Sequence, residues 1–479
     1  MMTSIVEEKL ISFKELEKKV FKFVCELGCE IIRFQLEQYD AELAADRDKS
    51  TLRNKGLKRT TIKTLCGEVE YRRRVYQTQT EEGATAFVYL LDEAIHMEKI
   101  GLISTNLAER IAMLAAEAPY RVTAETISET CGQSISHGGA WNLIQQLGER
   151  ISEEEEHAVK QMEADQSDGE KVVPILFEEM DGVWLRMQDK HHKRAPKQEL
   201  KVATTYEGWD AQSKKQSRLV GKRMLAGMEK SEKFHEKREA QIRQKYNADE
   251  IGQRILNGDG GSWIQDPYDP EALFQLDRFH IYQAIRRQLE EKEAQKAVTE
   301  LFEEQKIEEM LEYIRIYADS VSSDKPEDKR NKKALELYEY LRKNREGLLP
   351  YQEQIKELPQ AEEGIVYKGM GVQESQNCTV ITLRMKHRRM RWSEAGANNM
   401  AKVLYRKENR ELIETIERYT DGLIFTMQMQ EVIKSLSAAK APKKDGKGNV
   451  YVDLISVHMP LMDAMHNASR KAFTRAFCY

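Results

Sequence analysis

The sequence lacks the features that would place it in a membrane or in an oxidising compartment. None of its apolar runs approaches the ~20 residues that a bilayer-spanning helix needs, and no signal peptide opens the chain. Its six cysteines form no CxxC pair and have no regular spacing, which argues against both a zinc site and a disulfide framework. We therefore expect a cytoplasmic protein with no membrane partner.

Signatures of several enzyme classes are also missing. The chain has no GxSxG nucleophile elbow, no Walker lysine loop and no GxGxxG that opens a helix after a strand. Gly258–Gly261 is rich in glycine, but it contains Asp259 where a phosphate cradle would present bare backbone amides. The formal net charge of −5 does not exclude nucleic acid, because base is concentrated from Arg384 to Arg391, directly before Glu394. Fixed positive charge beside a metal-binding carboxylate suits a polyanionic substrate.

With 479 residues, the chain is too long for one compact core, and we expect two to four domains. Hydrophobic residues make up 40% and charged residues 32% of the chain, as in a well-solvated protein. The predicted segments are a long helix and β-hairpin (1–95), a helical region with a possible helix-turn-helix (96–165), the first part of an α/β core (166–294), an all-helical insertion (295–375), the second part of the core (376–420) and a C-terminal tail (421–479).

The N-terminal region begins with apolar residues spaced by three and four over 11–45, which predicts one long helix for packing or oligomerisation. A strand pair, Thr61–Leu65 and Val69–Tyr76, follows. Its outward Arg72 and Arg74 could contact DNA phosphates, or they could simply protect an exposed sheet edge.

A run of helices is predicted next, over residues 107–151. Leu107–Ala118 ends at a proline, Thr123–Cys131 ends at a glycine, and Ser136 is placed to cap a third helix. Two short helices around a glycine-containing turn are typical of a helix-turn-helix that reads DNA. The same pattern also occurs in ordinary helical domains.

The middle of the chain changes to strand-forming residues. The order of elements is strand, strand, strand, helix, strand, strand, helix, which matches a ribonuclease-H-like mixed sheet. The fold class expected is therefore α/β plus α. The expected elements are strands Val172–Met180 and Val183–Met187 joined by a turn at Gly182, strand Glu199–Tyr206, helix Lys222–Tyr246, strands at Ile255–Asn257 and Ala272–Leu276, and helix Phe279–Glu293.

Three acids stand at the borders of these elements. Asp181 and Asp259 each belong to an Asp-Gly pair that ends a predicted strand, and Glu394 opens the helical pattern Ala395–Tyr405. An Asp-Gly pair alone usually marks a turn, but two of them at the ends of strands in one sheet favour a shared site. Carboxylates of this kind can hold two divalent ions ~3.5–4 Å apart, the arrangement that cuts or joins phosphodiesters.

Three further residues are candidates for supporting roles. Asp277 and His280 share one face at a helix start and could orient a metal ligand or the substrate. The alternative is a capping aspartate and a surface histidine. Trp263 could stack on a splayed base, although packing in the core is the other interpretation.

Four separated motifs resemble those of one family. MDGVWL (180–185), GDGGSWI (258–264), LDRFHIYQAI (276–285) and RMKHRRMRWSEAGANNM (384–400) look like the signature segments of ISLre-two-type insertion-sequence transposases, which are similar to the Mutator-like superfamily of DDE transposases. The resemblance covers most of the chain but is loose after about Thr420, and Gly261, Ser262 and Ala395 depart from the pattern.

The resemblance implies a catalytic triad of Asp181, Asp259 and Glu394, with Asp277 and His280 matching an acid-or-cysteine, two-spacer, histidine element. It also implies magnesium or manganese as two bound ions, cleavage of transposon ends, joining to target DNA, and a homodimer or larger homo-oligomer. The residues expected to hold the DNA backbone are Lys386, Arg388, Arg389 and Arg391. The alternatives are a nuclease without strand joining and a catalytically silent DNA-binding protein descended from a transposase.

Overall fold

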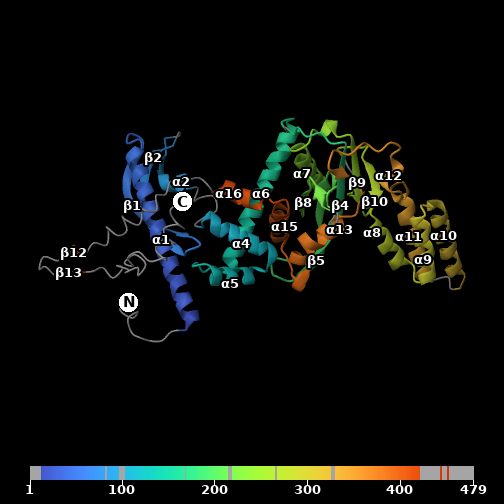
Figure 1. Ribbon diagram of the computed structural model, residues 1–479, viewed down its shortest axis with the longest axis horizontal. Coiled ribbons are helices and arrows are strands. Elements are labelled where there is room, and N and C mark those ends of the chain that lie inside the picture. The colour runs from blue at the N-terminus through green and yellow to red at the C-terminus, as the bar shows by residue number, and fades with distance from the viewer. Residues whose placement is uncertain are drawn as a thin grey trace. The chain divides into compact units, whose positions relative to one another are not determined.

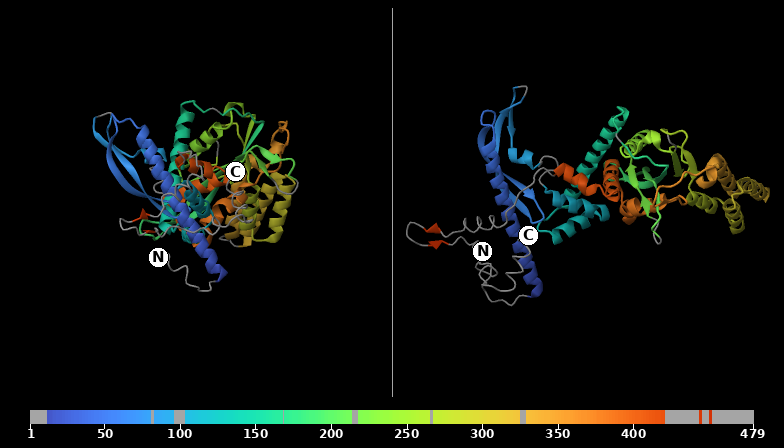
Figure 2. Two further views of the ribbon diagram at one scale, coloured as in Figure 1. Left: turned by 60° about the vertical axis from the view of Figure 1, so that its left-hand side comes forward. Right: turned by 45° about the horizontal axis from the view of Figure 1, so that its top comes forward.

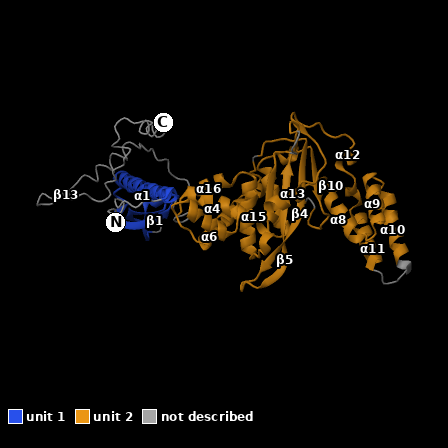
Figure 3. Ribbon diagram, turned by 60° about the horizontal axis from the view of Figure 1, so that its bottom comes forward, with its two compact units in different colours: residues 1–98, 421–479 blue, residues 99–420 orange. Residues whose placement is uncertain are grey.

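The computed structural model describes residues 12–80, 83–95, 103–167, 169–213, 218–264, 267–324 and 329–420, together with the short strands β12 (Lys443–Lys444) and β13 (Val450–Tyr451) (Figure 1). The chain divides into two compact units, residues 1–98 with 421–479, and residues 99–420 (Figure 3). Apart from β12 and β13, the predicted C-terminal tail 421–479 lies outside the described residues.

The first unit is built on the predicted long helix. Helix α1 begins at a capping box in which Ser12 and Glu15 satisfy each other's backbone N–H groups. Its second half packs on the sheet through Leu36, against Val69 and Tyr71 of β2. The predicted hairpin is present but longer than expected, and β3 adds a third antiparallel strand that the sequence did not indicate. The elements are α1 (Phe13–Asp46), β1 (Arg53–Lys63), β2 (Glu68–Gln79), β3 (Thr85–Val88) and α2 (Leu90–Ala94).

The second unit opens with the three predicted helices, α4 (Thr105–Glu117), α5 (Tyr120–Thr130) and α6 (His137–Glu163). Ser136 caps α6 as expected, because its Oγ accepts a hydrogen bond of 3.0 Å from the Gly139 N–H.

A five-stranded mixed sheet forms the centre of this unit, which confirms the α/β plus α class. The strand order is β10-β9-β4-β5-β8, with β9 parallel to both β4 and β10, and with β5 antiparallel to β4 and β8. The strands are β4 (Ile175–Gln188), β5 (Arg194–Tyr206), β8 (Arg223–Gly227), β9 (Gln253–Gly258) and β10 (Leu273–Leu276).

The turn predicted at Gly182 is wrong, because β4 runs straight through it. Asp181 pairs with Val202 and Gly182 with Lys201 in an unbroken ladder. The glycine is explained by a close approach instead: a Cβ added to Gly182 would lie 1.9 Å from Oε1 of Glu199. Asp181 therefore lies within a strand and does not end one.

The predicted helix 222–246 starts too early. Its first residues form β8, buried against β5, and the helix α7 covers only Ser231–Arg243. Pairing with the sheet overrides local helix preference here. The 3-10 turn η2 (Ala248–Glu250) leads into β9. On the α7 side of β4, Glu178 receives hydrogen bonds from the buried Arg238 and Arg254.

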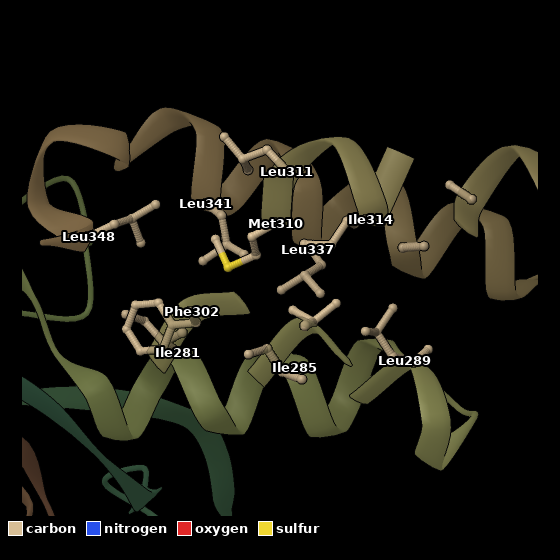
Figure 4. Packing of buried hydrophobic residues seen from close by; sticks show 14 of the residues in the cluster. Ile281, Ile285, Leu289, Phe302, Met310, Leu311, Ile314, Leu337, Leu341 and Leu348 are labelled. Carbon is tan, nitrogen blue, oxygen red and sulfur yellow. The ribbon is translucent and has the colours of Figure 1, made fainter. Parts of the chain in front are cut away.

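A helical subdomain follows β10. Helices α8 (Arg278–Gln288), α9 (Lys292–Glu303), α10 (Ile307–Asp324) and α11 (Lys329–Lys343) enclose a shared apolar core, in which Ile281 and Ile285 face Leu337 and Leu341 (Figure 4). Figure 2 shows these helices beside the β10 edge of the sheet from two further sides.

The expected insertion 295–375 is helical only in its first part. After η3 (Arg345–Leu348) and α12 (Tyr351–Gln354) the chain returns to the α/β core. There β11 (Ile365–Val366) pairs with β6 (Gly208–Asp210), which also pairs with β7 (Leu219–Val220). Short strands of two or three residues give too little periodicity to be recognised in a sequence.

The chain then runs as one helical stretch over α13 (Gln373–Gln376), the π-helical segment η4 (Asn377–Thr382) and α14 (Leu383–Met385). The 3-10 turn η5 (His387–Arg389) leads to α15 (Glu394–Glu408) and α16 (Leu412–Thr420). In the described ranges, every helix is too short or too polar to cross a bilayer.

Candidate functional site

Three aspartates stand side by side where three neighbouring parallel strands reach the same level. In the ladders, Met180 of β4 and Leu276 of β10 both pair with Gly258 of β9. The residue that follows in the chain is an acid each time: Asp181 within β4, Asp259 directly after β9 and Asp277 directly after β10. Residues in register on parallel strands point to the same face of a sheet, so the fold concentrates negative charge at this point.

Asp181 is held at both carboxylate oxygens. Its Oδ1 accepts a hydrogen bond of 2.7 Å from the Gly182 N–H, and its Oδ2 accepts one of 2.6 Å from the amide of Asn377. The Nε2 of His280 lies 3.7 Å from Oδ1. Asp181 is only 8% exposed, so this carboxylate is fixed in a largely buried position.

The sequence allowed two interpretations of Asp277 and His280, and each of them holds for one of the two residues. Asp277 caps α8, since its Oδ1 accepts a hydrogen bond of 2.7 Å from the Phe279 N–H. His280, however, faces Asp181 from the first turn of α8. Burial would lower the pKa of His280, but its hydrogen bond to Asp181 and the charges of Asp181, Asp277 and Asp259 together raise that pKa. All three aspartates thus favour the protonated form of this imidazole.

A buried carboxylate lies behind this row of acids. Glu179 faces the same side of β4 as Asp181 and is fully buried. It accepts hydrogen bonds from the hydroxyl of Tyr206 (2.6 Å), the amide of Asn257 (3.1 Å) and the backbone N–H of Gln373 (3.1 Å). The Asn257 amide also donates to Oδ2 of Asp277 at 3.0 Å. This network ties β4, β9, β10 and the start of α13 together directly under the site.

Glu374 is a site residue that the sequence analysis missed. Burial, and then the charge of Asp181, raise the pKa of Glu374, and His280, Asp277 and Lys386 also act on it. Glu374 lies one turn before Asn377 on the same helix, so both side chains share the face that meets Asp181. The signal in the sequence was an acid three residues before an asparagine at the start of a helical stretch, which is too common a pattern to be informative alone.

Glu394 is the first residue of α15, as predicted, and its side chain is exposed. Trp392, two residues earlier, forms an isolated parallel bridge beside β4: its N–H donates to the Arg186 carbonyl (3.0 Å) and its carbonyl accepts from the Gln188 N–H (2.8 Å). Because a strand rises ~3.3 Å per residue, Met187, the partner of Trp392, lies roughly 20 Å along β4 from Asp181. One turn into α15, however, Asn398 accepts a hydrogen bond of 3.0 Å from the Met228 N–H, next to the Gly227–Lys201 pair of the sheet. Glu374 and Glu394 are therefore both candidates for the third carboxylate.

The loop after β9 holds Asp259 from two directions. Its Oδ1 accepts a hydrogen bond of 2.8 Å from the Gly261 N–H, and its backbone carbonyl accepts one of 2.9 Å from the hydroxyl of Tyr340 on α11. Gly260 adopts a φ of +78°, and a Cβ there would lie 2.6 Å from Oδ1 of Asn344. The helical subdomain thus shapes the loop that carries Asp259.

Trp263 packs within the same layer. Its ring meets Phe234 edge-on with centroids 5.9 Å apart, and its Nε1 donates a hydrogen bond of 3.3 Å to Glu199. Burial raises the pKa of Glu199, opposed by Lys201, while the charges of Asp259 and Asp181 raise it further. Trp263 therefore lies at the edge of the acidic site, engaged by core side chains.

The basic cluster before α15 is mostly exposed. Lys386, Arg388, Arg389 and Arg391 have exposed side chains. Arg384 differs, because it is buried, donates a hydrogen bond of 2.6 Å to the Ala115 carbonyl and lies over the ring of Trp392. Arg384 anchors this segment to α4, and the four exposed cations remain the ones available to a polyanion.

The two arginines proposed in the first unit are placed differently. Arg72 is exposed, and its backbone N–H donates to Glu37. The guanidinium of Arg74 forms an ion pair of 2.5 Å with Asp40 of α1, a carboxylate only 2% exposed. Arg74 is therefore engaged in packing α1 on β2.

Among the described residues, no three carboxylate, histidine or cysteine side chains already stand in a metal-binding arrangement. The chemistry of the group nevertheless suits hard divalent cations, because the available donors are carboxylate oxygens and one imidazole. The hydrogen bond to Asp181 and the charges of the three aspartates raise the pKa of His280, which indicates local negative charge that a cation would offset.

The known proteins that resemble this chain share one family name. The chain is 25% identical to the UPF0236 protein in the vanSb 3′ region of Streptococcus gallolyticus over 405 residues, which is 82% of this chain and 83% of that protein. Two UPF0236 proteins of Caldanaerobacter subterraneus subsp. tengcongensis, TTE0610/TTE0881/TTE1053/TTE2432 and TTE1650/TTE2708, are each 23% identical over 82% of this chain and cover 78% and 74% of their own lengths. The model of the uncharacterised protein family UPF0236 matches residues 6–418, and the chain belongs to that family.

Proposed function

We propose that this protein is a DDE-type transposase of an insertion sequence, which cleaves transposon ends and joins them to target DNA with two bound divalent ions. The observation that carries the proposal is the row of Asp181, Asp259 and Asp277 at one level of three parallel strands, with His280 and Glu374 beside it.

The topology supports a ribonuclease-H-like core. Numbered in chain order, the five strands β4, β5, β8, β9 and β10 are arranged 5-4-1-2-3, with only the second strand antiparallel to the first. Helix α7 connects the third strand to the fourth. That connection and strand order are those expected of the fold, and the first and fourth strands carry the two leading acids.

The ligands proposed for the ions are Asp181, Asp259 and a third carboxylate. Two residues are candidates for that third position: Glu374, which lies one turn before the Asp181 partner Asn377, and Glu394, which the family resemblance implies. When bound, magnesium or manganese would activate the attacking oxygen and stabilise the departing one.

The remaining residues have distinct tasks in this proposal. Asn377 and the Gly182 N–H fix the Asp181 carboxylate, and buried Glu179 holds α13 against β4. His280 can donate a proton or a hydrogen bond close to the reacting phosphate. The exposed cations from Lys386 to Arg391 can hold the DNA backbone, where phosphate contacts dominate affinity.

Two further observations agree with a mobile element that acts as an assembly. The names of the Caldanaerobacter relatives combine four and two designations, as expected if copies occur at several loci of one genome. In addition, α1 exposes Phe13, Val20 and Val24 at helical spacing, a stripe suited to a second copy of the chain. A dimer or larger homo-oligomer would handle both transposon ends together.

The test is cleavage and strand transfer by the purified full chain, with magnesium or manganese and DNA that carries the gene's own flanks. Asp181→Asn and Asp259→Asn should each lower both activities at least about a hundredfold. Asp249→Asn, at an aspartate whose side chain is 84% exposed, should act as wild type. Cleavage without strand transfer would indicate a nuclease, and equal activity of all three variants would refute the metal site.

A further inference from the structure

A groove opens next to the acidic row, between α8 and α11. It has a volume of about 340 Å³, and Asp259 and His280 form one end of it. Everything else in its lining comes from the two helices of the helical subdomain. The groove thus shares Asp259 and His280 with the proposed cleavage site, and the rest of its lining has no part in the proposed chemistry.

The lining combines groups that recognise a nucleobase. Gln283 and Gln288 on α8 present side-chain amides, which pair with the donor and acceptor edges of bases. Tyr340 on α11 supplies an aromatic ring at the wall. Glu336 adds one carboxylate, an acceptor for an exocyclic amino group, and the exposed Arg287 adds one cation for a phosphate.

The apolar part of the lining is small. It consists of Ala284 and the buried Leu337, and Figure 4 shows Leu337 within the packed core of the subdomain. Such an apolar patch can contact the face of a flat base. A base within a duplex is stacked on both faces and cannot enter, so only an unpaired nucleoside can use these contacts.

Hydrogen bonds also connect the wall of the groove to the loop that carries Asp259. The Tyr340 hydroxyl donates its hydrogen bond of 2.9 Å to the Asp259 carbonyl, and the amide of Asn344 donates one of 2.8 Å to the Tyr340 carbonyl. A ligand against Tyr340 would therefore be held at a set position relative to Asp259.

We propose that this groove binds one unpaired nucleoside of the DNA strand, adjacent to the phosphate that lies at Asp259 and His280. The inference rests on the proposed function, since it assumes that DNA reaches the acidic site. The helical subdomain then recognises DNA that is melted or single-stranded next to the cleaved phosphate. Glu336 gives the site a preference for bases with an exocyclic amino group (cytosine, adenine or guanine) over thymine.

The experiment measures binding without chemistry. Fluorescence anisotropy in EDTA compares a blunt duplex with the same duplex carrying a three-nucleotide single-stranded extension of cytosine or thymine. The variants are Ala284→Phe, which fills the groove, and Gln283→Ala, a milder change that keeps the proposal testable if Ala284→Phe does not fold. Arg286→Ala is the matched control, because Arg286 is exposed on α8, outside the groove lining, and contacts its own helix.

Wild type should bind the cytosine extension about tenfold more tightly than the blunt duplex, and both groove variants should lose that difference. Arg286→Ala should retain it. Equal binding of extended and blunt DNA by wild type, or retention of the difference by folded groove variants, would overturn the nucleoside site. If wild type binds no DNA, the proposed function fails as well. If binding depends on the groove but no cleavage occurs with magnesium, the site stands and the proposed chemistry fails.

Discussion

The side-chain amide of Asn377 donates a hydrogen bond of 2.6 Å to Oδ2 of Asp181, across 196 positions of the chain. This contact brings the segment after the helical subdomain back onto the central strand of the sheet. It also leaves the Asp181 carboxylate with a fixed orientation, since the Gly182 N–H holds the other oxygen. A metal ligand that is oriented in this way needs no rearrangement when the ion binds.

Replacement of Asn377 by leucine, which has a similar shape but no amide, should weaken cleavage about 10- to 100-fold. The effect should be largest at low magnesium concentration, because a loosely oriented Asp181 binds the ion less tightly. Single-turnover cleavage over a magnesium titration measures this. Cys378→Ala, at the exposed neighbouring residue, is the control, and unchanged magnesium dependence in Asn377→Leu would contradict the role assigned to the contact.

The third carboxylate can be identified by a paired substitution. If Glu374 is the third ligand, Glu374→Gln should abolish cleavage to the same degree as Asp181→Asn, because Glu374 lies one turn before Asn377, which bonds Asp181. Glu394→Gln should then reduce cleavage by less than about tenfold. The reverse result would restore Glu394 to the triad.

Periodicity predicted the long elements well. The 34-residue helix α1, the Ser136-capped α6 and the strands β9 and β10 were all expected from residue spacing and capping residues. The continuity of β4 through Asp181-Gly182 was not, because an Asp-Gly pair reads locally as a turn. Only the crossing of Glu199 over Gly182, a contact between paired strands, reveals why a glycine is needed there.

The candidate site was also predictable only where its residues follow local patterns. Asp181 and Asp259 follow strand patterns that can be read along the chain, and Asp277 with His280 starts a helix. Glu374 and Asn377 reach the site only because the chain returns to β4 after the helical subdomain. No local pattern records that return, so these two residues could not be predicted from the sequence.

Packing between α6 and α15 should be intolerant of any side chain at Gly148. A Cβ there would lie 2.3 Å from Cβ and 2.4 Å from Cα of Asn399, so the helices would have to separate. Gly148→Ala should lower the free energy of unfolding by about 1–3 kcal/mol. Gly138→Ala, in the first turn of α6, meets nothing closer than 3.8 Å and should be neutral or slightly stabilising. Urea unfolding followed by circular dichroism compares them, and equal stability would contradict the close approach.

A buried charge cluster should make stability depend on acid pH. Burial raises the pKa of Glu229, but Lys402 and Lys237 outweigh it and lower that pKa to about 2. Glu155 contacts the same two lysines, at 2.8 Å each. Because the folded-state pKa is depressed, the Glu229 carboxylate stabilises the fold above its ordinary pKa, and this stabilisation is lost as pH falls toward 2.

Glu229→Gln should therefore cost roughly 3 kcal/mol in the free energy of unfolding at pH 7. The difference from wild type should shrink progressively below about pH 4.5. Unfolding by urea at a series of pH values measures it, with the exposed Glu339→Gln as the control. A difference that stays constant down to pH 3 would show that Glu229 is not held ionised by the lysines.

The π-helical turn of Asn377–Thr382 sets the rotational phase between two anchors, Asn377 on the central strand and Arg384 on the Ala115 carbonyl. An extra residue per turn changes the direction of every later side chain by about 100° relative to an uninterrupted α-helix. Deleting one residue from this turn would leave a regular helix, yet it would turn Arg384 away from α4 while Asn377 stayed in place. The segment therefore cannot change in length by even one residue if both anchors are to be kept.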